Sequence, residues 1–265
     1  MLSLGNQKGF TIMELLVTSS LGLIILGMTL SSVITNRNVL GKDNVRTRLN
    51  QNLRGSMDII GLDVRVAGEN LPKAFPAVLL TNGASNAPDT LTVRRNTIDE
   101  VLPVCTAIVA GTSVNTINFA VPGSVPGCSY SGQLQSYTAW NARRTEEGGQ
   151  FLAYIYNSST KDGEFFTVTN VSGNGTYYSL TKSAKTWQYN YPVGTSSVYI
   201  IEQWTYRYDT GMLQVIQNED TDNAFNVAFN ILDFQVDITM DDNSIKNSFI
   251  KTDSWTNIRT LNLSI

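Results

Sequence analysis

Residues 8–34 read KGFTIMELLVTSSLGLIILGMTLSSVI, and this stretch determines the structure predicted for the amino-terminal segment. Between Phe10 and Ile34 the only charged side chain is Glu14. As a helix that rises 1.5 Å per residue, residues 10–34 would measure roughly 37 Å, more than the ~30 Å of a bilayer's hydrocarbon core. The stretch therefore predicts a membrane-spanning helix.

A cleaved secretory signal peptide is the main alternative for an apolar amino-terminal stretch. Such a peptide has a shorter apolar region, no internal carboxylate and a cleavage site of small residues. Here the apolar run is longer, Glu14 lies inside it, and residues 31–35 (SSVIT) make a poor cleavage site. We therefore expect the segment to stay in the mature protein as an anchor. A charge within a membrane is costly. The carboxylate of Glu14 therefore either reaches the headgroup layer or serves a function.

The residues around Glu14 resemble the type III signal of type IV prepilins and related pseudopilins. Glycine, aromatic residue, glutamate and apolar run all occur at that family's spacing. The resemblance implies that a membrane prepilin peptidase removes the leader, residues 1–9, by cutting after Gly9, and that Phe10 is then N-methylated. It also implies that Glu14 neutralises the terminal amine of a neighbouring subunit during assembly. Such pairing is physically reasonable, since either charge alone is expensive in lipid.

The charges that flank the anchor do not support the orientation found in that family. Only Lys8 and the terminal amine precede it, whereas four basic residues follow it: Arg37, Lys42, Arg46 and Arg48. A count of positive charges would place the following segment in the cytoplasm. The orientation with the globular part in the periplasm is therefore implied by the resemblance alone.

The helix is predicted to continue beyond the anchor as an amphipathic half over residues 35–71. Apolar residues recur there at three- and four-residue spacing, at Leu49, Leu53, Met57, Ile60, Val64 and Ala67. Gly68 and Pro72 then mark the end of the helix. No proline precedes Pro72, so nothing forces a kink between residues 10 and 67. Major pilins carry a proline in the anchor, so the chain resembles a minor pilin more closely.

After Pro72 the apolar spacing changes from a helical period to alternation, which indicates strands. The predicted strands are residues 90–94, 150–155, 165–168, 176–180, 198–208, 212–216, 231–240 and 258–265. Residues 103–149 are interpreted as one long connection. We expect an α+β protein in which a long amino-terminal helix packs on a mainly antiparallel sheet, with a β-rich globular domain over residues 72–265.

Three further regions resemble the PilW group of minor pilins: residues 49–68, the hairpin at 198–216 and the segment up to residue 265. The J pseudopilin of type II secretion shares this layout. Residues 100–190 carry no such resemblance and are interpreted as a loop-rich insert. The resemblance implies a pilin-like fold and a subunit of a type IV pilus, a filament that serves twitching motility, adhesion and DNA uptake.

The amino-acid composition limits the classes of protein to which the chain could belong. The chain has 265 residues, 42% of them hydrophobic, and a net charge of -3, which suits a globular domain. Its pI near 5.0 argues against a nucleic-acid partner. It contains no histidine, which excludes the histidine-dependent catalytic triads and most catalytic zinc sites. We therefore expect neither an enzyme nor a cofactor.

Cys105 and Cys128 are the only cysteines. Two cysteines without histidine do not make a metal site. In an oxidising compartment they would form one disulfide, and in the cytosol they would be two free thiols. We predict the disulfide, because export follows from the prepilin resemblance.

Three short patterns suggest chemistry and have simpler interpretations. Residues 209–211 (DTG) match the aspartic-protease triplet, yet no second triplet exists and the position suits a turn. Residues 158–161 and 179–182 fit a serine–lysine pattern without its supporting motifs. Residues 218–223 hold three carboxylates that suit either calcium or, more simply, a solvated acidic loop.

The sequence thus predicts a minor pilin that primes or caps a type IV pilus. By resemblance its partners are other minor pilins and the major pilin, bound through the amino-terminal helix, together with prepilin peptidase, the inner-membrane assembly platform and the lipid bilayer. A J pseudopilin is the nearest alternative. A membrane-anchored periplasmic binding module or enzyme is the alternative from another class.

Overall fold

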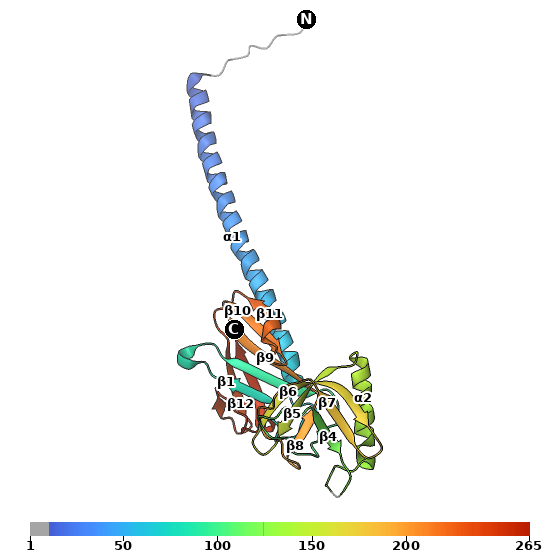
Figure 1. Cartoon of the computed structure of the whole chain (residues 1–265). Coiled ribbons are helices and arrows are strands. Elements are labelled where there is room, and N and C mark those ends of the chain that lie inside the picture. Colours follow the sequence, from blue (N-terminus) through green and yellow to red (C-terminus); the bar gives the residue numbers. More distant parts are fainter. Residues whose placement is uncertain (1–10, 124) are drawn as a thin grey trace. The chain divides into compact units, whose positions relative to one another are not determined.

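The structure, a computed structural model, describes residues 11–123 and 125–265. The chain divides into two compact units, Met1–Asn52 and Leu53–Ile265. Helix α1 (Ile12–Val66) is continuous and contributes residues to both (Figure 1). In the first unit its side chains are exposed apart from those of Leu49 and Asn52. α1 is the one helix in the described part of the chain that is long and apolar enough to cross a membrane.

The end of α1 follows from one glycine. Gly68 has a φ of +83°, a left-handed conformation that glycine adopts without strain. Its N–H donates to the carbonyl of Arg94 at 2.8 Å, so the chain leaves the helix and joins the sheet. The helix therefore ends at Val66, and residues 67–70 form turns before the β-rich domain begins.

The second unit contains three antiparallel sheets. A five-stranded sheet has the order β1 (Val78–Thr81), β2 (Thr90–Asn96), β9 (Ile201–Asp209), β10 (Met212–Gln217) and β11 (Phe225–Phe229). A three-stranded sheet has the order β13 (Ile245–Lys246), β12 (Gln235–Met240) and β14 (Ile258–Ser264). Short 3-10 turns lie at Ala84–Asn86, Ser131–Gln133, Thr221–Asn223 and Trp255–Asn257. The α+β class is confirmed.

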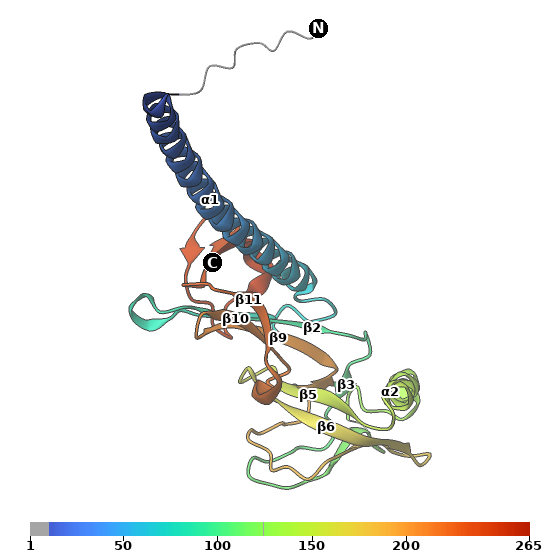
Figure 2. The same ribbon diagram turned by 90° about the horizontal axis from the view of Figure 1, so that it is seen from above.

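The third sheet has six strands, and Figure 2 shows its central pair, β5 and β6, side by side. Its order is β3 (Leu102–Pro103), β8 (Ser196–Tyr199), β5 (Phe151–Asn157), β6 (Asp162–Gly173), β7 (Tyr178–Lys182) and β4 (Thr116–Ala120). Helix α2 (Leu134–Glu146) packs beside it. The expected loop-rich insert at 100–190 is therefore wrong: this region supplies five of the six strands and a helix.

The prediction of a long connection over residues 103–149 is also wrong. β4 is a short strand whose alternate residues Ile117 and Phe119 are fully buried. α2 is held by two aromatic side chains: Tyr137 stacks on Tyr178 with ring centroids 4.4 Å apart, and the Trp140 indole donates to the carbonyl of Glu100 at 2.9 Å. These are tertiary contacts, and local apolar spacing does not reveal them.

Two predicted strands are divided differently. The extended stretch 198–208 is shared between β8 and β9, which belong to different sheets. The buried side chain of Asn96 accepts the N–H of Ile200 at 3.0 Å, and this marks the change of sheet. The strand predicted at 231–240 begins only at Gln235, because Asn230 has a φ of +57° and breaks the extended backbone after β11.

Candidate functional site

Gly9 and Phe10, the predicted cleavage and methylation positions, lie outside the described residues. Glu14 lies in the first turn of α1. Its carboxylate Oε2 accepts the N–H of Thr11 at 3.1 Å and the Thr11 hydroxyl at 3.2 Å. In return, the Glu14 N–H donates to Thr11 Oγ1 at 3.3 Å. This reciprocal arrangement is a capping box, which satisfies N–H groups that the start of a helix leaves unpaired.

Glu14 therefore has a local role that the sequence interpretation missed. The signal was present, because Thr11 and Glu14 stand three residues apart, as a capping box requires. Both carboxylate bonds use Oε2. Among the described residues, Oε1 accepts no hydrogen bond, so the cap leaves this oxygen able to accept from another group.

The last turns of α1, from Leu53 onward, pack on the five-stranded sheet. Ile60 is fully buried in the core that this sheet shares with β12. Ser56 Oγ donates to the carbonyl of Val227 in β11 at 2.6 Å. The hydroxyl of Tyr206 in β9 donates to Asp63 Oδ2 at 2.5 Å. The amphipathic half of the helix is thus fixed by the apolar packing of Ile60, with Leu53 and Val64 against the same core, and by two hydrogen bonds.

The electrostatics of this contact centre on Asp63. Burial raises the pKa of Asp63, and the bond from the Tyr206 hydroxyl opposes that rise only in part. Burial, together with the bond to Asp63, also raises the pKa of Tyr206. Arg95 lies nearby and pairs with Glu202 at 2.7 Å and Glu69 at 3.3 Å. Asp63 and Tyr206 therefore form a hydrogen bond that is partly shielded from solvent, and this bond fixes the position of the helix on the sheet.

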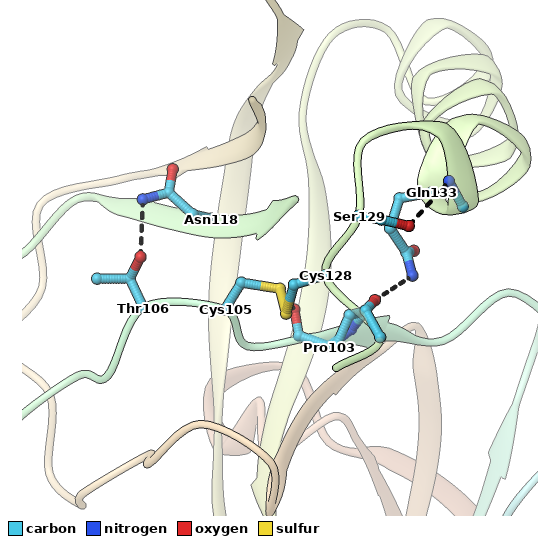
Figure 3. The surroundings of a disulfide bond; sticks show 9 residues. Pro103, Cys105, Thr106, Asn118, Cys128, Ser129 and Gln133 are labelled. Carbon is cyan, nitrogen blue, oxygen red and sulfur yellow. Dashed lines mark hydrogen bonds between the residues drawn. A yellow bond between two sulfur atoms is a disulfide. The ribbon is translucent and has the colours of Figure 1, made fainter. Parts of the chain in front are cut away.

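Cys105 and Cys128 form a disulfide (Figure 3), the pairing that the sequence predicts. It joins the segment after β3 to the loop before α2. Backbone bonds on either side support the closure, from the Cys105 N–H to Asn118 O at 2.8 Å and from the Val121 N–H to Cys128 O at 2.9 Å. Asn118 also donates its side-chain amide to Thr106 (Figure 3). The bridge therefore fastens the edge strand β4 of the six-stranded sheet.

The residues of the aspartic-protease and serine–lysine patterns take part in turns and in hydrogen bonds to the backbone. Asp209-Thr210-Gly211 forms the turn between β9 and β10, with positive φ at Thr210 and Gly211. Lys161 lies in the β5–β6 turn, and its Nζ donates to Ala74 O at 2.9 Å. Lys182 is buried, and its Nζ donates to the carbonyls of Ser183 and Lys185. In the described part of the chain, no hydrogen bond joins the serine and lysine side chains of either pattern.

In the acidic loop, residues 218–223, two asparagine side chains form hydrogen bonds. Asn223 donates to Asp220 Oδ2 at 2.9 Å, and Asn218 accepts the N–H of Gln203 at 2.8 Å. Within residues 11–123 and 125–265 no three His, Cys, Asp or Glu side chains are placed to hold a metal ion together. Comparison of the chain with protein-family models, curated proteins and solved structures found no match.

Proposed function

We propose that this chain is a minor prepilin of the PilW kind, a structural and assembly subunit of a type IV pilus with a pilin-like fold. The observation that carries the proposal is α1. One unbroken helix has an exposed apolar first half that carries a single carboxylate, and a second half that packs one face on an antiparallel sheet. A subunit that is first held in a membrane and later in a helical bundle needs this division.

The assembly mechanism has two parts. Apolar helix surfaces of neighbouring subunits pack together through residues 10–67, and Glu14 pairs with the terminal amine of a neighbour. The capping box supports the second part, because it orients the carboxylate and leaves Oε1 able to accept from an ammonium. Pairing removes two charges that would each be costly in lipid.

The proposed location is the bacterial inner membrane, with the globular domain in the periplasm and, after assembly, at the pilus tip. The Cys105–Cys128 disulfide supports a periplasmic domain, because disulfides persist in oxidising compartments. The partners would be other minor pilins and the major pilin, after processing by prepilin peptidase and delivery to the assembly platform.

A replacement strain tests the proposal and separates it from the J pseudopilin alternative. The gene is deleted in frame and restored in trans, surface pili are counted, and export of type II secretion substrates is measured in the same cells. We expect pili to be lost on deletion and restored by the gene, with export unchanged. Lost export with normal pili would identify a secretion pseudopilin, and no change in either would reject both assignments.

A further inference from the structure

A group of basic side chains follows the apolar run of α1. We define the basic ring as Arg37, Lys42, Arg46 and Arg48. All four are exposed, and within the described residues none of them forms an ion pair. Asp43 is the only acidic residue between Glu14 and Asp58, although the whole chain has a net charge of -3. With four basic residues and one acidic residue, residues 37–48 therefore carry a net charge of +3.

The ring surrounds the helix. At about 100° per residue, Arg37 and Arg48 lie within about 20° of one another, whereas Lys42 and Arg46 lie about 140° and 180° away from Arg37. A single protein partner would contact one side of the helix and leave the opposite pair unused. A layer that encloses the helix can reach Arg37 on one side and Lys42 on the other. The distribution therefore favours an enclosing partner over a one-sided one.

The distance of each basic residue from the apolar run indicates that the enclosing layer is the headgroup layer of a membrane. Arg37 follows the end of the apolar run at Ile34 by roughly 5 Å, which is within the ~5–7 Å headgroup layer of a bilayer. Lys42 follows by roughly 12 Å, and its long side chain can turn back towards the membrane. Arg46 and Arg48 lie farther out, where attraction decays over a Debye length of ~8–10 Å. Exposed apolar side chains, Val39 and Leu40, lie between the charges, as is usual at an interface.

We propose that the basic ring binds anionic phospholipid headgroups on the membrane face where α1 emerges. The inference rests on the part of the proposed function that places α1 across a membrane, and it does not depend on pilus assembly. Phosphate oxygens would accept from the guanidinium groups of Arg37 and, with Lys42, provide the direct contacts. The two outer arginines would contribute less, because salt screens their attraction at that distance.

The test measures lipid affinity on the full chain in a neutral detergent. Phosphatidylglycerol and phosphatidylcholine are titrated separately, and bound lipids are counted by native mass spectrometry. We expect phosphatidylglycerol to bind about 25-fold more tightly, since each basic residue near an anionic surface contributes about fivefold and two are in direct reach. The preference should shrink when salt is raised to about 0.5 M.

The ring variant is Arg37→Gln with Lys42→Gln, Arg46→Gln and Arg48→Gln. A control variant removes the same charge from exposed positions in the second unit, Arg54→Gln, Arg65→Gln, Lys73→Gln and Arg259→Gln. We expect the ring variant to lose the preference and the control to keep it.

Equal affinity for the two lipids, or an unchanged preference in the ring variant, would overturn the proposal and leave an acidic protein surface as the partner to seek. Competition by millimolar inorganic phosphate would also overturn it, since a free anion would then suffice. If the wild-type chain shows no lipid preference although its gene restores surface pili, this inference alone is rejected, so its failure is distinguishable from failure of the proposed function.

Discussion

Replacing Gly68 with alanine should destabilise the globular domain through two separate effects. Gly68 has a φ of +83°, and a left-handed alanine costs about 1–2 kcal/mol. A Cβ at this position would also lie 2.2 Å from Cζ3 and 2.3 Å from Cη2 of the Trp255 ring, closer than any real contact. Overpacking of this kind costs typically about 1–3 kcal/mol. We therefore expect a total loss of about 2–5 kcal/mol.

Gly194 supplies a matched control. Its φ is +84°, and a Cβ added there would meet nothing within 4 Å, so Gly194→Ala carries the backbone cost alone. The assay is thermal unfolding of the full chain in detergent, followed by near-ultraviolet circular dichroism. At about 2–4 °C per kcal/mol for a domain of this size, Gly68→Ala should lower Tm by about 4–20 °C and Gly194→Ala by only about 2–8 °C.

A double-mutant cycle separates the two costs. In a Trp255→Leu background the clash is absent, so Gly68→Ala should cost no more there than Gly194→Ala does. Equal losses for the two alanine variants in the wild-type background would refute the steric explanation. An undiminished cost of Gly68→Ala in the Trp255→Leu background would refute it as well.

Three further predictions test other contacts. Glu14→Gln keeps an acceptor for the Thr11 cap but removes the charge, so surface pili should fall. Thr11→Val should cost only about 1 kcal/mol of local helix stability and keep the pili. Wild-type piliation of Glu14→Gln would contradict charge pairing. Because burial raises the pKa of Asp63, its contribution to stability is complete below the unfolded pKa and is lost as pH rises through the folded pKa. The Tm of Asp63→Asn relative to wild type should therefore be higher at pH 7 than at pH 4, and the opposite trend would count against this sign. Replacing Cys105 and Cys128 together by serine should cost about 3 kcal/mol, measured as a lower denaturant midpoint, and reductant should shift only the wild type.

Features set by local chemistry were predictable from the sequence. The helix end at Gly68 follows from a residue that tolerates positive φ, and the β9–β10 hairpin follows from Asp209-Thr210-Gly211 between two alternating runs. The disulfide was predicted because the chain has only two cysteines and the prepilin resemblance implies an oxidising compartment.

Features set by distant contacts were not predictable. α2 has one buried side chain, Trp140, and its amphipathic signal is therefore too short to detect. The change of sheet at Ile200 depends on the side chain of Asn96, more than a hundred positions earlier. Contacts of this kind depend on the assembled fold and leave no periodic pattern in the chain.

Of the residues in the candidate site, only those that belong to a recognisable sequence motif were predictable. Glu14 stood out because it is a carboxylate in an apolar run, whereas its bond to Thr11 was not predicted, although the three-residue spacing of a capping box is visible in the sequence. The bond between Asp63 and Tyr206 joins residues 143 positions apart, and nothing in either neighbourhood indicates it.

Intact and amino-terminal mass spectrometry of the protein from its native membrane tests the central proposal most directly. Processing as a prepilin predicts a chain that begins at Phe10 and carries one added methyl group on its terminal amine. A chain that still begins at Met1, in cells whose prepilin peptidase is active, would contradict the assignment and favour a membrane-anchored module instead.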